Sequence, residues 1–200
     1  MRAASWTLMR REWRLLAIAS IALAVGVLGA EPYARLASPV YAAAARIIAL
    51  GHPWQIISIG LGPGGSGPGS VLRLTGAVRA RSDDPTPAAV LVGKLQADAV
   101  VESPVIFWAI LLAWPATSVR QRFAYVALGI PLFVCLEIAT TVCELVNPLA
   151  YASAVLAGNP DPLTGWERWT RFLEAGGRVA LALIAALLAI SLARTVKRAA

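Results

Sequence analysis

Glu137 is the residue of this sequence best placed to do chemistry, because it is a carboxylate inside the long apolar run GIPLFVCLEIATTVCELV. A charge at membrane depth costs roughly 2.5–3.5 kcal/mol on insertion scales, so such a residue usually has a partner or a task. It could handle a proton as a general acid. It could instead hold the bundle together by bonding to Thr140, Thr141 or a facing helix, or dock to another membrane protein. We favour packing or docking.

Cys143 and Glu144 lie at the outer end of the same run. A cysteine nucleophile needs a base and positive surroundings, which His52 and Arg178 could supply. Yet the one histidine of the sequence lies in a separate segment, and nothing in the sequence brings it to Cys143. No spacing typical of metal ligands occurs. We therefore expect no catalytic residue, metal or cofactor, with a membrane enzyme using Glu137 or Cys143 as the alternative.

Trp166 and Trp169 belong to the segment TGWERWTRFLEAGG, which is typical of an amphipathic helix. Thr164 followed by Glu167 three residues later forms a capping box. The two tryptophans share an apolar stripe with Phe172 and Leu173, opposite charged residues. This pattern predicts a helix lying in the membrane interface, ended by the glycine pair just before Arg178.

The composition identifies the elements that position these residues as membrane spans. Hydrophobic residues make up 58% of the chain and charged residues 14%, against about 25% charged in an average soluble domain. The net charge is +7, but nine of the 18 basic residues lie within residues 2–14, 120–122 and 194–198, next to apolar runs. Orientation of spans by positive charge explains this distribution better than nucleic-acid binding, which we exclude.

These patterns predict a mainly helical membrane protein with four spans, both termini cytoplasmic, in a bacterial inner membrane, and a small antiparallel β domain outside. Residues 104–146 form a transmembrane hairpin whose turn, residues 118–122, carries Arg120 and Arg122. The remaining segments are a basic leader with an uncleaved signal-anchor helix (1–30), a periplasmic helix plus β domain (31–103), a periplasmic segment with the amphipathic helix (147–177), and a last span with a basic tail (178–200).

The outer domain is predicted from alternation. In residues 71–81, Leu72, Leu74 and Val78 alternate with polar residues such as Arg73 and Thr75, as in a half-buried strand. Residues 54–61 and 89–101 supply further strand regions. The glycine-rich residues 62–70 form a loop, and residues 31–50 form an interfacial helix rather than another span.

The sequence resembles the small membrane proteins associated with exosortase H in bacterial envelope sorting. The resemblance is one of layout: an anchor helix, a short outer strand domain, a close helical hairpin (FWAILLAWP, then GIPLFVCLE), an outer amphipathic segment, and a last span entered by RFLEAGGRVALALIAALLA. It includes no catalytic motif. It implies a non-enzymatic accessory role in the bilayer beside a larger, exosortase-like membrane protein. A subunit of a transport or secretion complex is a further alternative.

Overall fold

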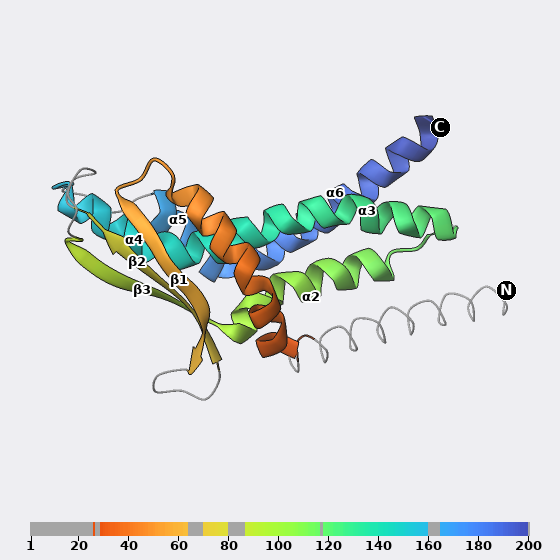
Figure 1. Ribbon diagram of the computed structural model, residues 1–200. Coiled ribbons are helices and arrows are strands. Elements are labelled where there is room, and N and C mark those ends of the chain that lie inside the picture. The colour runs from red at the N-terminus through yellow and green to blue at the C-terminus, as the bar shows by residue number, and fades with distance from the viewer. Residues whose placement is uncertain are drawn as a thin grey trace.

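The protein consists mainly of helices, with one small sheet at the end of a helical bundle (Figure 1). The computed structural model describes residues 26, 29–63, 70–79, 87–116, 118–159 and 165–199. The first described helix covers residues 29–49. The strands are β1 (Trp54–Pro63), β2 (Ser70–Val78) and β3 (Ala89–Gln96). The further α-helices are α2 (Ala97–Ala113), α3 (Val119–Glu137), α4 (Cys143–Leu156), α5 (Gly165–Phe172) and α6 (Arg178–Ala199). Two short π-helices, η1 (Ile138–Val142) and η2 (Leu173–Gly177), follow α3 and α5.

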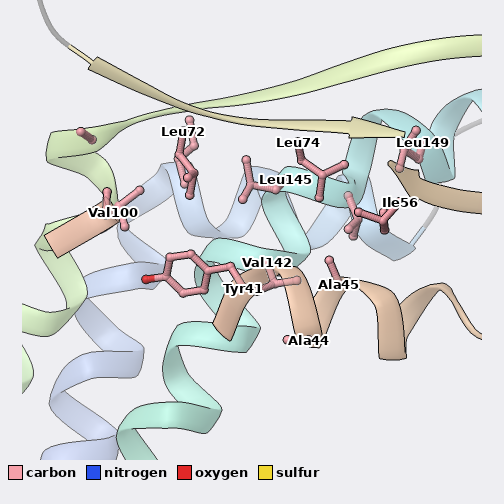
Figure 2. Packing of buried hydrophobic residues seen from close by; sticks show 14 of the residues in the cluster. Tyr41, Ala44, Ala45, Ile56, Leu72, Leu74, Val100, Val142, Leu145 and Leu149 are labelled. Carbon is pink, nitrogen blue, oxygen red and sulfur yellow. The ribbon is translucent and has the colours of Figure 1, made fainter. Parts of the chain in front are cut away.

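The three strands form an antiparallel sheet in the order β1-β2-β3. Leu72, Leu74 and Val78 are fully buried, which confirms the predicted inward face of this strand. Figure 2 shows Leu72 and Leu74 pointing from the sheet toward Tyr41 and Val142. Helix 29–49 and α4 therefore cover the inner face of the sheet together.

Two glycines let α4 approach the sheet closely. A Cβ on Gly93 of β3 would lie 2.1 Å from the carbonyl oxygen of Leu145, and one on Gly76 of β2 would lie 2.5 Å from Cδ1 of Leu149. A larger residue at Gly93 would collide with the backbone of α4, whereas one at Gly76 would require the Leu149 side chain to move. The bare backbone at Gly93 therefore sets the distance between helix and sheet.

The third strand is shorter than predicted, since β3 ends at Gln96 and α2 begins at Ala97. Asp98 stands in the first turn of α2, and its side chain accepts a hydrogen bond from the amide of Ala99 (2.9 Å). An acidic residue there is favourable at the positive end of the helix dipole. Residues 97–101 are therefore helical rather than extended.

The helical hairpin is present, but its turn lies earlier than predicted. The backbone of Trp114, the residue before Pro115, is extended, as steric contact with a following proline favours. Ser118 then caps α3 by accepting a hydrogen bond from the amide of Gln121 (3.2 Å). Arg122 thus lies in the first turn of α3, where it donates to the carbonyl oxygen of Leu112 and closes the hairpin.

Two described helices are long and apolar enough to cross a membrane: Val119–Leu156, with mean hydropathy 2.1, and Gly165–Thr195, with mean hydropathy 2.0. The 17-residue α2 packs beside α3 and α6 in the bundle (Figure 1). The predicted basic leader, most of the anchor helix, the loop at residues 64–69 and the cap at Thr164 lie outside the described residues.

Candidate functional site

Glu137 lies at the end of α3, and helix 29–49 supplies its partners. Its side chain is 5% exposed. The hydroxyl of Tyr33 donates to Oε2 at 2.9 Å, and the hydroxyl of Tyr41 donates to the same oxygen. Neither of the two threonines predicted as possible partners binds Glu137. The hydroxyl of Thr140 donates to the carbonyl of Leu136 (2.9 Å), and the hydroxyl of Thr141 is buried without a hydrogen bond to a described residue.

Both tyrosines remain donors over the physiological pH range. Burial raises the pKa of the Tyr41 hydroxyl, and the nearby Glu137 carboxylate raises it further. The same two causes, in the same order, raise the pKa of Tyr33. The phenols therefore stay protonated and can satisfy Oε2, whereas Oε1 of Glu137 is buried without a hydrogen bond to any described residue.

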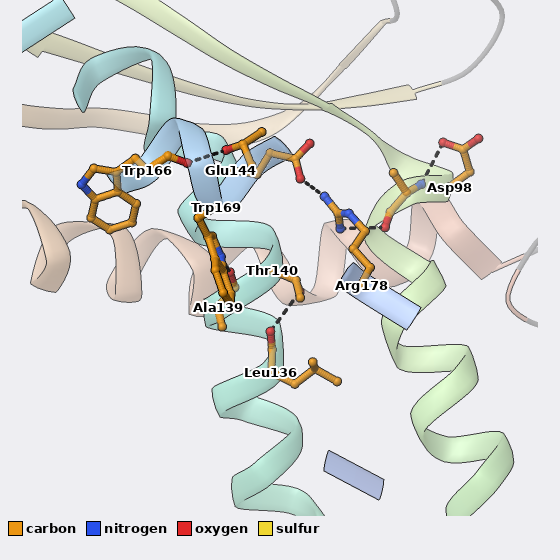
Figure 3. A network of polar contacts seen from close by, with 10 residues as sticks. Asp98, Leu136, Ala139, Thr140, Glu144, Trp166, Trp169 and Arg178 are labelled. Carbon is orange, nitrogen blue, oxygen red and sulfur yellow. Dashed lines mark hydrogen bonds and ion pairs between the residues drawn. The ribbon is translucent and has the colours of Figure 1, made fainter. Parts of the chain in front are cut away.

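A π-helix begins immediately after Glu137. In η1 the amide of Cys143 bonds to the carbonyl of Ile138, five residues back. The wider turn leaves the Ala139 carbonyl without its usual helical donor. The indole Nε1 of Trp169 donates to this oxygen at 2.7 Å, as Figure 3 shows. Trp169 thus stabilises an irregular turn beside Glu137, a role that its predicted position on an interfacial stripe did not suggest.

Arg178 forms a second buried contact at the start of α6. One nitrogen of its guanidinium pairs with the carboxylate of Glu144 in α4, and the other donates to the carbonyl of Ala99 in α2 (3.2 Å), as Figure 3 shows. The two paired side chains are 7% and 15% exposed. The charge of Arg178 also interacts with Glu102 and Glu137. One cation therefore connects three helices at the junction of bundle and sheet.

The predicted residues divide into two groups. Glu137, Glu144, Arg178 and Trp169 come together around η1, and Trp166 packs against the core of the sheet domain. Cys143 and His52 do not form a catalytic pair. The His52 ring stacks on Trp54 with centroids 4.8 Å apart, and Cys143 is a half-buried free thiol without a hydrogen bond to any described residue.

The contacts of Glu137 and Arg178 join helices that are distant in the sequence. A cavity of about 540 Å³ opens beside α2, with Asp98, Glu102 and Val105 in its lining, and Glu137 is not among its lining residues. Within the described ranges, no group of three or more His, Cys, Asp or Glu side chains could hold a metal ion.

Tyr33 and Tyr41 are the residues of the site that the sequence reading missed. They are eight residues apart, slightly more than two helical turns. Two tyrosines at this spacing, which lie on one side of a helix, were the available signal. Their shared acceptor lies 104 and 96 residues further along the chain, so local periodicity could not reveal it.

Comparisons with protein-family models, with curated proteins and with solved structures find no match to this chain.

Proposed function

We propose that this chain is a non-enzymatic accessory protein of a bacterial inner membrane, which presents its sheet domain to a larger membrane protein. The observation that carries the proposal is the closed environment of Glu137, whose Oε2 accepts from two tyrosine hydroxyls of helix 29–49. A proton-handling carboxylate needs a path for its proton, whereas a structural one needs donors. Glu137 has the donors and lies outside the lining of the neighbouring cavity.

The surface of the bundle supports a membrane location. Large apolar side chains of α3 and α6 are exposed, among them Phe123 (70%), Ile130 (51%) and Ile184 (54%). Such a surface is unfavourable in water and suits lipid or partner helices. The proposed topology has four spans with both termini cytoplasmic and the sheet outside. As the family resemblance implies, the larger partner is an exosortase-type sorting enzyme.

Glu137→Gln and Glu137→Leu test the proposal. Gln keeps a hydrogen-bonding group of the same shape and removes only the ionisable proton. We expect Glu137→Gln to preserve co-purification with the larger membrane protein in mild detergent and the activity of the complex. Glu137→Leu should weaken association by about 1–2 kcal/mol, because hydrogen bonds within membranes seldom contribute more.

Glu174→Gln is the matched control, since it removes a carboxylate from an exposed position of η2. Both properties should be unchanged in this variant. An assembled complex that loses all activity in Glu137→Gln would contradict the accessory role. It would instead favour an enzyme or a transport subunit using the Glu137 proton.

A further inference from the structure

The sheet has one face that no described element covers. Helix 29–49 and α4 cover the inner face, whereas β3 presents Val90, Val92, Lys94 and Gln96 as exposed residues of the opposite face. We propose that this outer face and the edge of β3 bind an extended acidic segment of a partner protein, which pairs with β3 as a fourth strand. This inference rests on the accessory role proposed above and specifies the partner's chemistry.

A pair of cations marks this face. In the register of β2 and β3, Arg73 stands directly opposite Lys94. Like charges at opposed positions of an antiparallel pair destabilise it. The described residues of the three strands include no carboxylate to offset them, and Lys94 makes no hydrogen bond or ion pair with any described residue. An anionic partner would relieve the repulsion.

Arg73 is held in place on the sheet. Its Nη2 donates to the carbonyl of Pro63, while its Nε is buried without a hydrogen bond to a described residue. A Cβ on Gly62 of β1 would lie only 3.1 Å from this Nε. Glycine at this position therefore lets the guanidinium lie close over β1, while its Nη1, which makes no hydrogen bond to a described residue, can donate to a carboxylate.

A charged residue on an edge strand often serves only to prevent aggregation. That explanation accounts for Lys94, because β3 is the last strand of the described sheet (Figure 1). It does not account for Arg73, because β2 is the central strand and has no edge to protect.

The same edge has features that suit a peptide rather than a free anion. Val90 and Val92 are 57% and 43% exposed on the same face as Lys94. An added strand bonds to the unpaired backbone of an edge, while its alternate side chains meet the neighbouring strand. An added strand with carboxylates at the alternate positions beside Lys94 and Gln96, and apolar residues at those beside Val90 and Val92, would match the chemistry of this face.

The test uses the purified full-length protein in nanodiscs of neutral phosphatidylcholine. A phage-displayed library of random twelve-residue peptides is selected against it. We expect enriched peptides with Asp or Glu at alternate positions. The double variant Arg73→Gln/Lys94→Gln should weaken binding of an enriched peptide about tenfold, as expected for two partly exposed ion pairs. Arg46→Gln, which removes an exposed charge from helix 29–49, should leave binding unchanged.

Methylation of alternate peptide amides distinguishes strand addition from simple charge attraction, because it removes the donors that pair with the β3 backbone. We expect it to abolish binding. Enrichment without acidic residues, binding that survives the double variant, or binding insensitive to methylation would each overturn the proposal. Binding to phosphatidylglycerol vesicles that is lost in the double variant, with no acidic peptide enriched, would assign the face to lipid. This peptide experiment contains no other protein of the proposed complex. A negative result would therefore contradict only the peptide-binding inference, and the co-purification experiment would still test the accessory role separately.

Discussion

At the scale of single residues, the contacts around Glu137 and Arg178 connect elements that are distant in the sequence. Each is a buried ionisable side chain whose partners come from other helices. A buried charged group is costly once a partner is removed, because the remaining group keeps its desolvation penalty. Substitutions at these partners should therefore have large effects on stability.

Tyr41→Phe should lower the free energy of unfolding by about 1–3 kcal/mol, because it removes one of two donors to a buried carboxylate. The control is Tyr151→Phe, at a side chain of α4 that is 42% exposed, which should change stability little. Unfolding in mild detergent, followed by circular dichroism, measures both. The cost of Tyr41→Phe should fall in a Glu137→Leu background, where the acceptor is absent; an undiminished cost would contradict the proposed bond.

Arg178→Met should destabilise the protein by about 3–5 kcal/mol, because it leaves Glu144 buried without its cation. The Arg171–Glu167 pair of α5 offers a control: its arginine side chain is 65% exposed and its partner lies four residues earlier. Arg171→Met should cost no more than about 0.5 kcal/mol. The same unfolding measurement applies, and equal costs for the two substitutions would show that Arg178 acts as an ordinary surface charge.

At the scale of elements, the closest packing is that between α4 and the sheet. The helix meets β2 and β3 where Gly76 and Gly93 provide bare backbone. The neighbouring core residues Leu145 and Leu149 are fully buried. The position of α4 thus depends on Gly93 as well as on the apolar residues around it.

Gly93→Ala should destabilise the protein by about 1–3 kcal/mol, since the new methyl group would force the backbone at Leu145 away from the sheet. Gly60→Ala in β1 is the control, because its Cβ would meet nothing within 4 Å. It should be neutral or slightly stabilising. Thermal unfolding of the two variants side by side checks this expectation. Similar melting temperatures would mean that α4 is not held at the distance described.

At the scale of the whole molecule, the bundle and the sheet domain form two hydrophobic clusters. The bundle cluster combines Phe107 and Leu111 of α2 with Tyr125 of α3 and four alanines of α6. The small residues of α6 permit close contact between helices, as in membrane bundles. Arg178 and Glu144 lie where the bundle meets the domain.

The proposed topology predicts the outcome of reporter fusions. Fusions after Ser118 and after Ala200 should give cytoplasmic signals, and a fusion at Gly67 should give a periplasmic one, because the basic residues at 120–122 and 194–198 favour the cytoplasmic side. Alkaline phosphatase and green fluorescent protein report the two sides. A cytoplasmic signal at Gly67 would contradict the topology.

Local patterns in the sequence were sufficient to predict the hairpin and the buried face of β2, and they singled out Glu137 as a carboxylate within an apolar run. Each of these depends on local rules: the length of an apolar run, the period of two in a strand, and the cost of a charge in an apolar environment. The same rules misplaced the turn of the hairpin by a few residues, because Pro115 and Ser118 act through specific backbone geometry.

Only the tertiary structure decided which groups meet. The tyrosines that bind Glu137 are 104 and 96 residues away along the chain, and Arg178 is 34 residues from Glu144. The π-helix after Glu137 is stabilised by an indole from α5, and the glycines of the sheet acquire their role only when α4 packs on them. These contacts depend on how whole helices and strands pack in space. The residues next to a side chain in the sequence carry no information about a partner that comes from another element.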